Sequence, residues 1–402
     1  MKAKLFYLIA ALSLIIHAAP CKVNAGPKIS TSGYVRNFLV VSDSGNGAAF
    51  EALSRVRVKL NIVTSESSSL ELAYELLPWL RDPGGILSDR SFANSSFFSY
   101  RVEDLGDNIL DNQEKDFVLA QNLDRAFFTY TASGFDLLAG RQPVAFGSAR
   151  VINPTDIIAP FTFNTIAKDE LAGVDALRVK TPLAEMGECD AGIVFGKDFH
   201  ADESAAFVRI KTYLLKTDIS LMTMVFKENI LLGIDLARSI GGAGTWLEAA
   251  HTLAHAAHDY RPGEDYFRLT AGADYSFTSR LYAFTEYHFN GAGSGTPSDY
   301  LNTANETAFT DGAVYLLARH YITPGLSFEI TPLLIFSSQL LINMEDVSAL
   351  LSPSIEWSVS QNIYAGLSAF IGIGNVSSDS ERPDNEFGLY TDTYFASLSF
   401  YF

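Results

Sequence analysis

Segments of roughly ten residues in which apolar and polar side chains alternate recur along the chain. In the clearest case, residues 54–64, the apolar Val56, Val58, Leu60 and Ile62 alternate with Arg55, Arg57, Lys59 and Asn61. Successive side chains of a strand point to opposite faces, so this segment has one aliphatic and one charged face. Residues 267–277 and 281–290 repeat the pattern, and many such segments at even spacing predict a large β-sheet.

The two faces of these strands decide how the sheet is built. After the first 25 residues the sequence holds no apolar run of about eighteen residues, so no transmembrane helix is expected. If the aliphatic faces lie in lipid, every backbone N–H and C=O group must be paired within the sheet, and the sheet has to close. The charged faces then line a wet lumen. We therefore predict an all-β fold, a transmembrane antiparallel up-and-down β-barrel.

The alternating segments divide the chain into about eighteen strands. Their expected ranges are residues 29–41, 54–64, 70–79, 118–130, 135–146, 173–181, 190–197, 205–215, 218–226, 230–238, 245–255, 266–277, 281–290, 314–322, 327–337, 347–358, 363–372 and 391–402. An even number of strands brings both ends of the barrel to the same, periplasmic side. No linker divides residues 26–402, which are expected to form one barrel domain.

The connections between these segments are of two kinds. Short polar turns are expected on the periplasmic side, at residues 66–68, 133–134, 216–217, 278–280 and 323–325. Long connections are expected on the extracellular side, at residues 80–117, 147–172, 291–312 and 374–390. Short turns at one end and long loops at the other are the habit of outer-membrane barrels.

Both ends of the chain carry signals of export. Lys2 and Lys4 precede an apolar run over residues 5–19, and small residues up to Ala25 form a cleavage site, so residues 1–25 are expected to be a secretory signal peptide. The last segment alternates and ends on Phe402, which resembles the assembly signal of Gram-negative outer-membrane barrels. That resemblance implies an outer-membrane location, the barrel-assembly machinery as a partner, and a lipid bilayer with lipopolysaccharide around the protein.

Charge and reactive residues exclude several classes of function. The formal net charge of −17 argues against nucleic-acid binding. Cys189 is the only cysteine after the signal peptide, so neither a disulfide nor a cysteine-based haem or zinc site is expected. His251 and His255 share a strand face but Glu248 falls on the opposite one, which disfavours a metal site. No nucleophile stands out, so we expect no catalytic residue, no metal and no cofactor.

Charged residues on the predicted inward faces are candidates for a lumen and its constriction. The basic ones are Arg36, Arg55, Arg57, Lys59, Arg141, Arg178, Lys180, Arg209, Lys211 and Arg268. The acidic ones are Glu71, Glu75, Asp235, Glu248, Asp274, Glu286, Glu329 and Glu356. Basic residues lie mainly on the first half of the strands and acids more on the second. Two alternatives stay open: a transverse field that filters solutes, or charges that only neutralise one another.

The middle of the chain carries a family resemblance. The motifs in order are Gly140-Arg141-Gln142, Asn153-Pro154-Thr155-Asp156 and Gly173-Val174-Asp175-Ala176-Leu177-Arg178. This order looks like the alginate-export type of outer-membrane barrel and related porins, and it implies a channel of eighteen strands or similar. Asn153-Pro154 initiates a turn, so the long loop can fold into the mouth. Arg141 and Arg178 then either hold a carboxylated solute or pin the loop in a network with Asp156 and Asp175.

Three functions fit these expectations. The first is a porin-like channel for small hydrophilic or anionic solutes, with polysaccharide or uronate export as a special case. Export is weakened by the many inward acids, since a polyuronate calls for a basic conduit. The second is a non-conducting sleeve for a periplasmic or multihaem cytochrome partner. The third is an adhesin or structural barrel with a plugged lumen, and the sequence does not decide between them.

Overall fold

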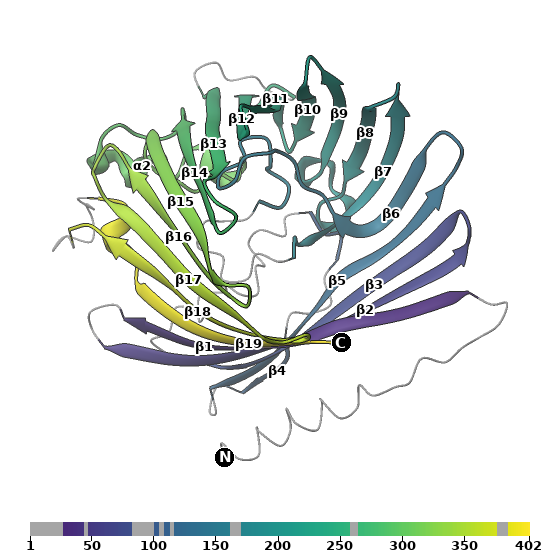
Figure 1. The fold of residues 1–402 in the computed structure, drawn as a ribbon. Coiled ribbons are helices and arrows are strands. Elements are labelled where there is room, and N and C mark those ends of the chain that lie inside the picture. Colours follow the sequence, from purple (N-terminus) through teal and green to yellow (C-terminus); the bar gives the residue numbers. More distant parts are fainter. Residues whose placement is uncertain are drawn as a thin grey trace.

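The computed structural model describes residues 27–43, 47–82, 100–103, 108–112, 116–160, 170–257, 264–375 and 385–402. Residues 1–25, the expected signal peptide, lie outside these ranges. The described chain forms one antiparallel sheet of 19 strands that curls into a ring (Figure 1).

The strands follow one another around the ring in chain order. The first nine are β1 (Lys28–Asp43), β2 (Ala48–Ser65), β3 (Ser68–Leu80), β4 (Asn108–Asn112), β5 (Phe117–Thr131), β6 (Asp136–Pro143), β7 (Gly173–Leu183), β8 (Gly187–Val194) and β9 (Ala205–Leu214). The others are β10 (Thr217–Phe226), β11 (Asn229–Ile240), β12 (Ala243–Leu253), β13 (Tyr266–Ser276), β14 (Leu281–Asn290), β15 (His320–Thr331), β16 (Leu334–Asn343), β17 (Ala349–Ser360), β18 (Ile363–Ile373) and β19 (Asp392–Tyr401).

Helical turns in the described chain occur in the connections. They are η3 (Lys197–Phe199), η4 (Ala201–Glu203), η5 (Pro297–Asp299), α2 (Tyr300–Thr303), α3 (Thr307–Thr310) and η6 (Phe387–Leu389). None of the helices in the described ranges has the length and apolar character to cross a membrane.

Pairing of the first strand with the last closes the ring. β1 bonds to β2 on one side and to β19 on the other, from Tyr34 opposite Tyr401 to Asp43 opposite Asp392. Beyond that ladder, Gly33 and Phe402 exchange two backbone hydrogen bonds of 3.0 Å each. β4 is not part of the ring, because it pairs only with the first residues of β5. Eighteen strands therefore form a closed barrel, which confirms the predicted fold.

The outward side of the barrel is an exposed apolar band. Strand register places Leu177 beside Ile193, Ile210 beside Leu221, and Ile355 beside Leu367. These side chains are exposed, with Leu221 at 52% and Leu367 at 62%. Soluble monomers rarely expose contiguous apolar patches of this extent, whereas a membrane barrel needs them around its outside.

The largest error in the expected strands concerns β15 and β16. The sequence predicted a turn at residues 323–325 between strands 314–322 and 327–337, but Pro324 lies inside β15, opposite Thr285 of β14. The turn comes after Thr331 instead. Proline has no N–H to donate, and the ladder from β15 to β16 is interrupted there, between Ile322 and Gly325. At that point β15 still pairs with β14 on its other edge. A proline–glycine pair, which usually marks a turn, therefore lies within a strand.

Short turns and long connections lie at opposite ends of the barrel. The turns expected near residues 66–68, 133–134, 216–217 and 278–280 all occur at one end. Leu215 and Lys216 join β9 to β10 with φ of 54° and 61°. Gly241 and Gly242 join β11 to β12 with φ of 60° and 89°. Positive φ at both central residues is what a two-residue hairpin requires.

Replacing Val58 by Arg tests the assignment of the outward face. Val58 is 42% exposed in the outward band, and an arginine near the middle of the bilayer costs roughly 2–4 kcal/mol. We therefore expect Val58→Arg to lower the free energy of unfolding from lipid vesicles by about that amount. Asn61→Arg, on the inward face of the same strand, is the matched control and should be nearly neutral. Equal losses in the two variants would mean that the faces are wrongly assigned.

Candidate functional site: the lumen of the barrel

Most of the predicted lumen residues share one face of the strands. Register places Arg36 opposite Arg55, Arg57 opposite Glu75, Asp190 opposite Arg209, and Glu248 opposite Thr270. The two-residue alternation adds Lys59, Arg178, Lys180, Lys211, Arg268, Asp274 and Glu286 to that face. Arg141 and Asp175 lie opposite each other near the long-loop end of β6 and β7. Asp156 lies in the connection that follows β6.

Ion pairs hold several of the basic residues on β2 to β9. Arg57 lies 2.7 Å from Glu75 and 2.6 Å from Asp124. Lys59 lies 3.0 Å from Glu71. Arg178 and Arg209 both reach the buried Asp190, at 2.5 and 3.0 Å. These contacts favour the alternative in which inward charges neutralise one another, because each of these basic residues lies within ion-pair distance of a carboxylate.

The connection after β6 turns into the barrel. Figure 1 shows the described part of this segment running inside the ring of strands. We call its described part, residues 144–160, the lumen loop. Its hydrogen bonds reach inward-facing residues of β11, β12, β13 and β14. The lumen loop therefore narrows the lumen from the side of these strands.

A carboxylate on β14 holds the middle of the lumen loop. Glu286 accepts hydrogen bonds from the backbone N–H groups of Arg150 at 2.7 Å, Val151 at 3.2 Å and Ile152 at 3.0 Å. The indole N–H of Trp246 donates to the same carboxylate at 3.0 Å. Four donors occupy the lone pairs of one carboxylate, so its burial is compensated without a cation in contact.

A second carboxylate, on β12, holds the loop on either side of that segment. Glu248 is fully buried. It accepts hydrogen bonds from the N–H groups of Ser148 at 3.2 Å and Ala149 at 3.3 Å, and from the N–H and hydroxyl of Thr155 at 2.8 and 2.6 Å. Gly147 has φ of +93°, and a Cβ there would lie 2.5 Å from the Glu248 carboxylate. Only glycine fits this approach without strain.

Apolar side chains fix the ends of the lumen loop against the wall. Val144, Phe146, Ile157 and Ile158 belong to one buried cluster with Phe207, Met222 and Met224 of the strands. The rings of Phe146 and Phe207 lie 4.9 Å apart in an edge-to-face arrangement. Because these strand residues point inward, a pore without the loop would expose them to water. This part of the lumen is therefore packed like the interior of a soluble protein.

The predicted network of Arg141, Asp156, Asp175 and Arg178 is wrong as a single unit. Arg141 pairs with Asp175 at 2.8 Å, whereas Arg178 pairs with Asp190. Arg141 also donates to the carbonyl of Glu103 at 2.7 Å, so it ties an adjacent connection to the rim. The spacing of residues in the sequence could not reveal that Arg178 would form its ion pair with Asp190 on the next strand.

Asp156 lies apart from both arginines. It is buried within the lumen loop against the backbone N–H groups of Phe146, Ile158 and Ala159, with Arg268 as the nearby positive charge. Burial raises the pKa of Asp156 to about 7. Its carboxylate therefore serves the internal structure of the loop rather than binding the loop to Arg141 or Arg178.

Two more connections, from β14 to β15 and from β18 to β19, lie over the lumen at the long-loop end. Glu386 is buried and accepts hydrogen bonds from the hydroxyl of Tyr321 at 2.5 Å, the N–H of Leu317 at 2.9 Å and the amide of Asn343 at 3.0 Å. Burial raises the pKa of Glu386 to about 7. Ile152 of the lumen loop belongs to the apolar cluster around Tyr321. The three connections therefore pack as one unit.

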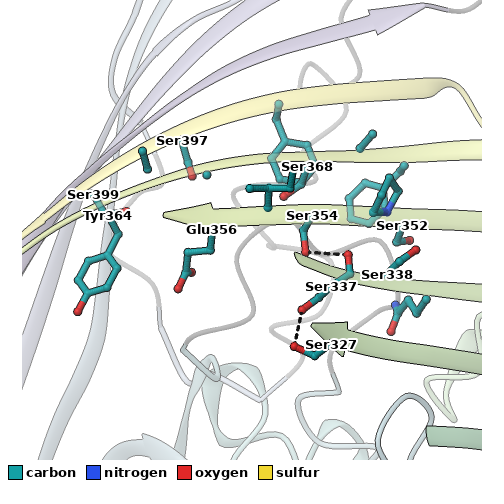
Figure 2. A pocket seen from close by; sticks show the side chains of 18 of the residues that line it. Ser327, Ser337, Ser338, Ser352, Ser354, Glu356, Tyr364, Ser368, Ser397 and Ser399 are labelled. Atoms are coloured by element: carbon teal, nitrogen blue, oxygen red, sulfur yellow. Dashed lines mark hydrogen bonds between the residues drawn. The ribbon is translucent and has the colours of Figure 1, made fainter. Parts of the chain in front are cut away.

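Open space remains along β14 to β19 and β1. A cavity of about 710 Å³ lies there, and Figure 2 shows hydroxyl groups from these strands pointing into it. The serines that line it are Ser327, Ser337, Ser338, Ser352, Ser354, Ser368, Ser397 and Ser399. Sequence reasoning missed these residues because it searched the inward faces for charge. The signal was present in the spacing of Ser352 and Ser354 and of Ser397 and Ser399.

Removing the carboxylate of Glu286 should release the lumen loop. In Glu286→Ala four donors lose their acceptor, and two of these hydrogen bonds, from Ile152 and Trp246, are buried. Each unsatisfied group that stays buried costs roughly 1–3 kcal/mol. We expect faster cleavage within residues 144–160 by protease added to folded protein, and a lower melting temperature. Glu329→Ala, at an acid on β15 with no hydrogen bond to the loop among the described contacts, is the matched control. An unchanged cleavage pattern in Glu286→Ala would contradict the role of Glu286 as the anchor.

Arg178 is expected to act as a structural pin. Arg178→Ala removes both hydrogen bonds, of 2.6 and 2.5 Å, that the guanidinium makes to Asp190. Breaking one side of a buried ion pair costs roughly 3–5 kcal/mol, so the melting temperature should fall. Arg209, 3.0 Å from Asp190, remains as a partner of that carboxylate, so the loss should grow in the double variant Arg178→Ala/Arg209→Ala, which leaves Asp190 without a cation. If Arg178→Ala melted at the same temperature as the native chain, the structural role would be contradicted, and Arg178 would again be a candidate for contact with a solute.

Comparisons with known proteins identify the fold. No protein-family model matches the chain, and no curated relative matches its sequence. Solved structures do match along nearly the whole chain. The outer membrane protein OpdK of Pseudomonas aeruginosa has a TM-score of 0.57 at 9% identity, covering 93% of this chain and 98% of its own. OccK2 of P. aeruginosa, in complex with glucuronate, has a TM-score of 0.55 at 11% identity, covering 93% and 98%.

OccAB2 of Acinetobacter baumannii matches equally well, with a TM-score of 0.55 at 8% identity over 93% of this chain and 98% of its own. A likeness at such low identity concerns the path of the backbone and carries no residue roles. The chain therefore has the fold of these barrels, and the chemistry of its lumen has to be argued from its own side chains.

Proposed function

We propose that the chain is an outer-membrane channel through which small hydrophilic solutes diffuse. The observation that carries the proposal is the combination of an apolar exposed outside with a cavity of about 710 Å³ on the polar inside. An apolar band seats the barrel in hydrocarbon, and a lumen narrowed by a pinned loop sets a size limit for what passes. Such a role needs no catalytic group and no cofactor.

A preference for anions is supported by two facing arginines. Arg36 of β1 lines the cavity and lies opposite Arg55 of β2. Within the described ranges, no carboxylate lies within ion-pair distance of Arg55. The charge of Arg36 faces the cavity, and a positive charge on the wall of a channel attracts anions. The ligands named for two of the similar structures, glucuronate and vanillate, are carboxylates, which agrees with this proposal.

Export of a polysaccharide is the narrower version suggested by the motifs around Asp156. The lumen loop weighs against it, because a polymer would have to thread past a segment that two carboxylates hold in place. The sleeve for a cytochrome partner is disfavoured on similar grounds. The wall of β11 to β14 that such a partner would contact is already covered by the chain itself.

Single-channel recording in a planar bilayer tests the proposal. The refolded protein should give stable open steps, and a salt gradient should give a reversal potential on the anion side. Arg36→Gln should move the reversal potential towards cations without closing the channel, since it removes a charge that faces the cavity. Arg238→Gln, near the short-turn end of β11, is the matched control. A protein that inserts without conducting would refute the channel, and block by oligo-uronate would support the export version.

A further inference from the structure

A row of serines crosses four neighbouring strands at one level of the cavity. Strand register places Ser327 of β15 opposite Ser337 of β16, Ser337 opposite Ser354 of β17, and Ser354 opposite Ser368 of β18. Neighbouring strands lie about 4.8 Å apart, so the row spans roughly 14 Å. We call these four residues the serine row. Figure 2 shows them side by side on the cavity wall.

Strand stability does not account for the serine row. Strands favour β-branched and aromatic residues, and serine is not among those that stabilise a pleated sheet. Among the described residues no apolar layer covers the row, in contrast to the inward residues of β9 to β11, which the lumen loop covers. Small side chains at these four positions leave the cavity open at its wall.

The hydroxyl groups of the row keep unused hydrogen-bonding capacity. Ser337 donates to the hydroxyl of Ser327 at 3.0 Å, and Ser354 donates to the backbone carbonyl of Ser337 at 3.4 Å. Each hydroxyl has one donor and two acceptor sites, so these two bonds leave most of the acceptors available. A row of groups that both donate and accept matches a solute that carries hydroxyl groups in series.

The wall around the serine row is almost free of charge. Among the residues that line this cavity, Arg36 and Glu356 are the only two that carry a formal charge at neutral pH. Arg36 donates to the hydroxyls of Ser399 and Tyr401, which engages its donors with the wall. The opposite wall, on β2 to β9, is built from ion pairs. Selection on the serine side therefore depends on hydroxyl groups and shape more than on charge.

Aromatic rings border the row on both sides. Tyr282 and Phe284 of β14 line the cavity next to β15, and Phe370 and Phe395 line it beyond Ser368. The faces of such rings carry partial negative charge and attract the polarised C–H groups of a sugar ring. Binding sites for small molecules combine apolar and aromatic surface with a few placed polar groups. Hydroxyls flanked by rings suit a saturated ring with hydroxyl groups at its edge.

We propose that the serine row and the rings beside it bind polyhydroxylated solutes, sugars or polyols, and recognise their hydroxyl groups irrespective of a carboxylate. This proposal rests on the proposed channel and names the class of solute that pauses in it. Glucose and maltose are the neutral probes, and glucuronate is the matched acid of the same ring. The distinguishing expectation is that the neutral sugars bind without any anionic group.

The first test is current block in single channels in potassium chloride. Glucose and maltose added at millimolar concentration should raise current noise and reduce the mean current. The triple variant Ser337→Ala/Ser354→Ala/Ser368→Ala removes three hydroxyls with little change in volume, and block by maltose should weaken roughly tenfold while the salt conductance stays. The matched control is Ser30→Ala/Ser32→Ala/Ser69→Ala, which changes three lumen-side serines outside the cavity. Maltose should block this variant as strongly as it blocks the native channel.

The outcomes separate this inference from the proposed function. A conducting channel that neither sugar blocks, or whose block survives in the serine-row variant, would overturn the inference and leave the channel standing. Calorimetry in detergent measures maltose binding directly and so tests the site even if the barrel does not conduct. A barrel that does not conduct, yet binds maltose and loses binding in the serine-row variant only, would keep the site and overturn the channel. Equal loss in the control variant would show an unspecific effect and would also overturn the inference.

Discussion

Backbone hydrogen bonding in the absence of water is the constraint on which this structure depends. In hydrocarbon an unpaired N–H or C=O group costs several kcal/mol, so the outward apolar band is tenable only because β1 and β19 pair and leave no free edge. The same demand recurs inside the barrel. The lumen loop has no neighbouring strand to receive its N–H groups, and Glu248 and Glu286 serve as their acceptors. Backbone hydrogen bonds between strands close the wall of the barrel. Where the chain leaves the wall, side-chain carboxylates accept the hydrogen bonds of its backbone N–H groups.

The two halves of the lumen are built on different chemistry. On β9 to β14 apolar inward residues pack against the lumen loop and inward carboxylates anchor it, so the loop fills the interior there. On β15 to β19 serines line an open cavity, with aromatic rings and Glu356 beside them. Ion pairs on β2 to β9 hold the wall between them. An uneven lumen of this kind confines solutes to one side, where they contact hydroxyl groups and a few charged side chains. The remaining charged side chains form ion pairs that stabilise the wall.

The sequence predicted the barrel well because the alternation of side chains is a local property. The charged face of β2, from Arg55 to Lys59, and both ends of β14 could be read directly from the residues. Pro324 misled because its tolerance depends on which edge of β15 is bonded, which is a property of the neighbouring strand. Pairings such as Arg178 with Asp190 were out of reach for the same reason. Glu248 and Glu286 were recognised as inward acids, but their partners are backbone groups, which leave no trace in residue type.

The anchoring of the lumen loop has a consequence for the order in which the protein assembles. Ile152 is bonded to a carboxylate 134 residues further along the chain, and Thr155 to one 93 residues further. The loop is therefore complete long before the strands that will hold it exist, and contacts between such distant segments form late. Until β12 and β14 are in place, the lumen loop has neither its acceptors nor its apolar wall. The narrowing of the lumen therefore depends on strands whose anchoring carboxylates lie 93 and 134 residues further along the chain than the loop residues they hold.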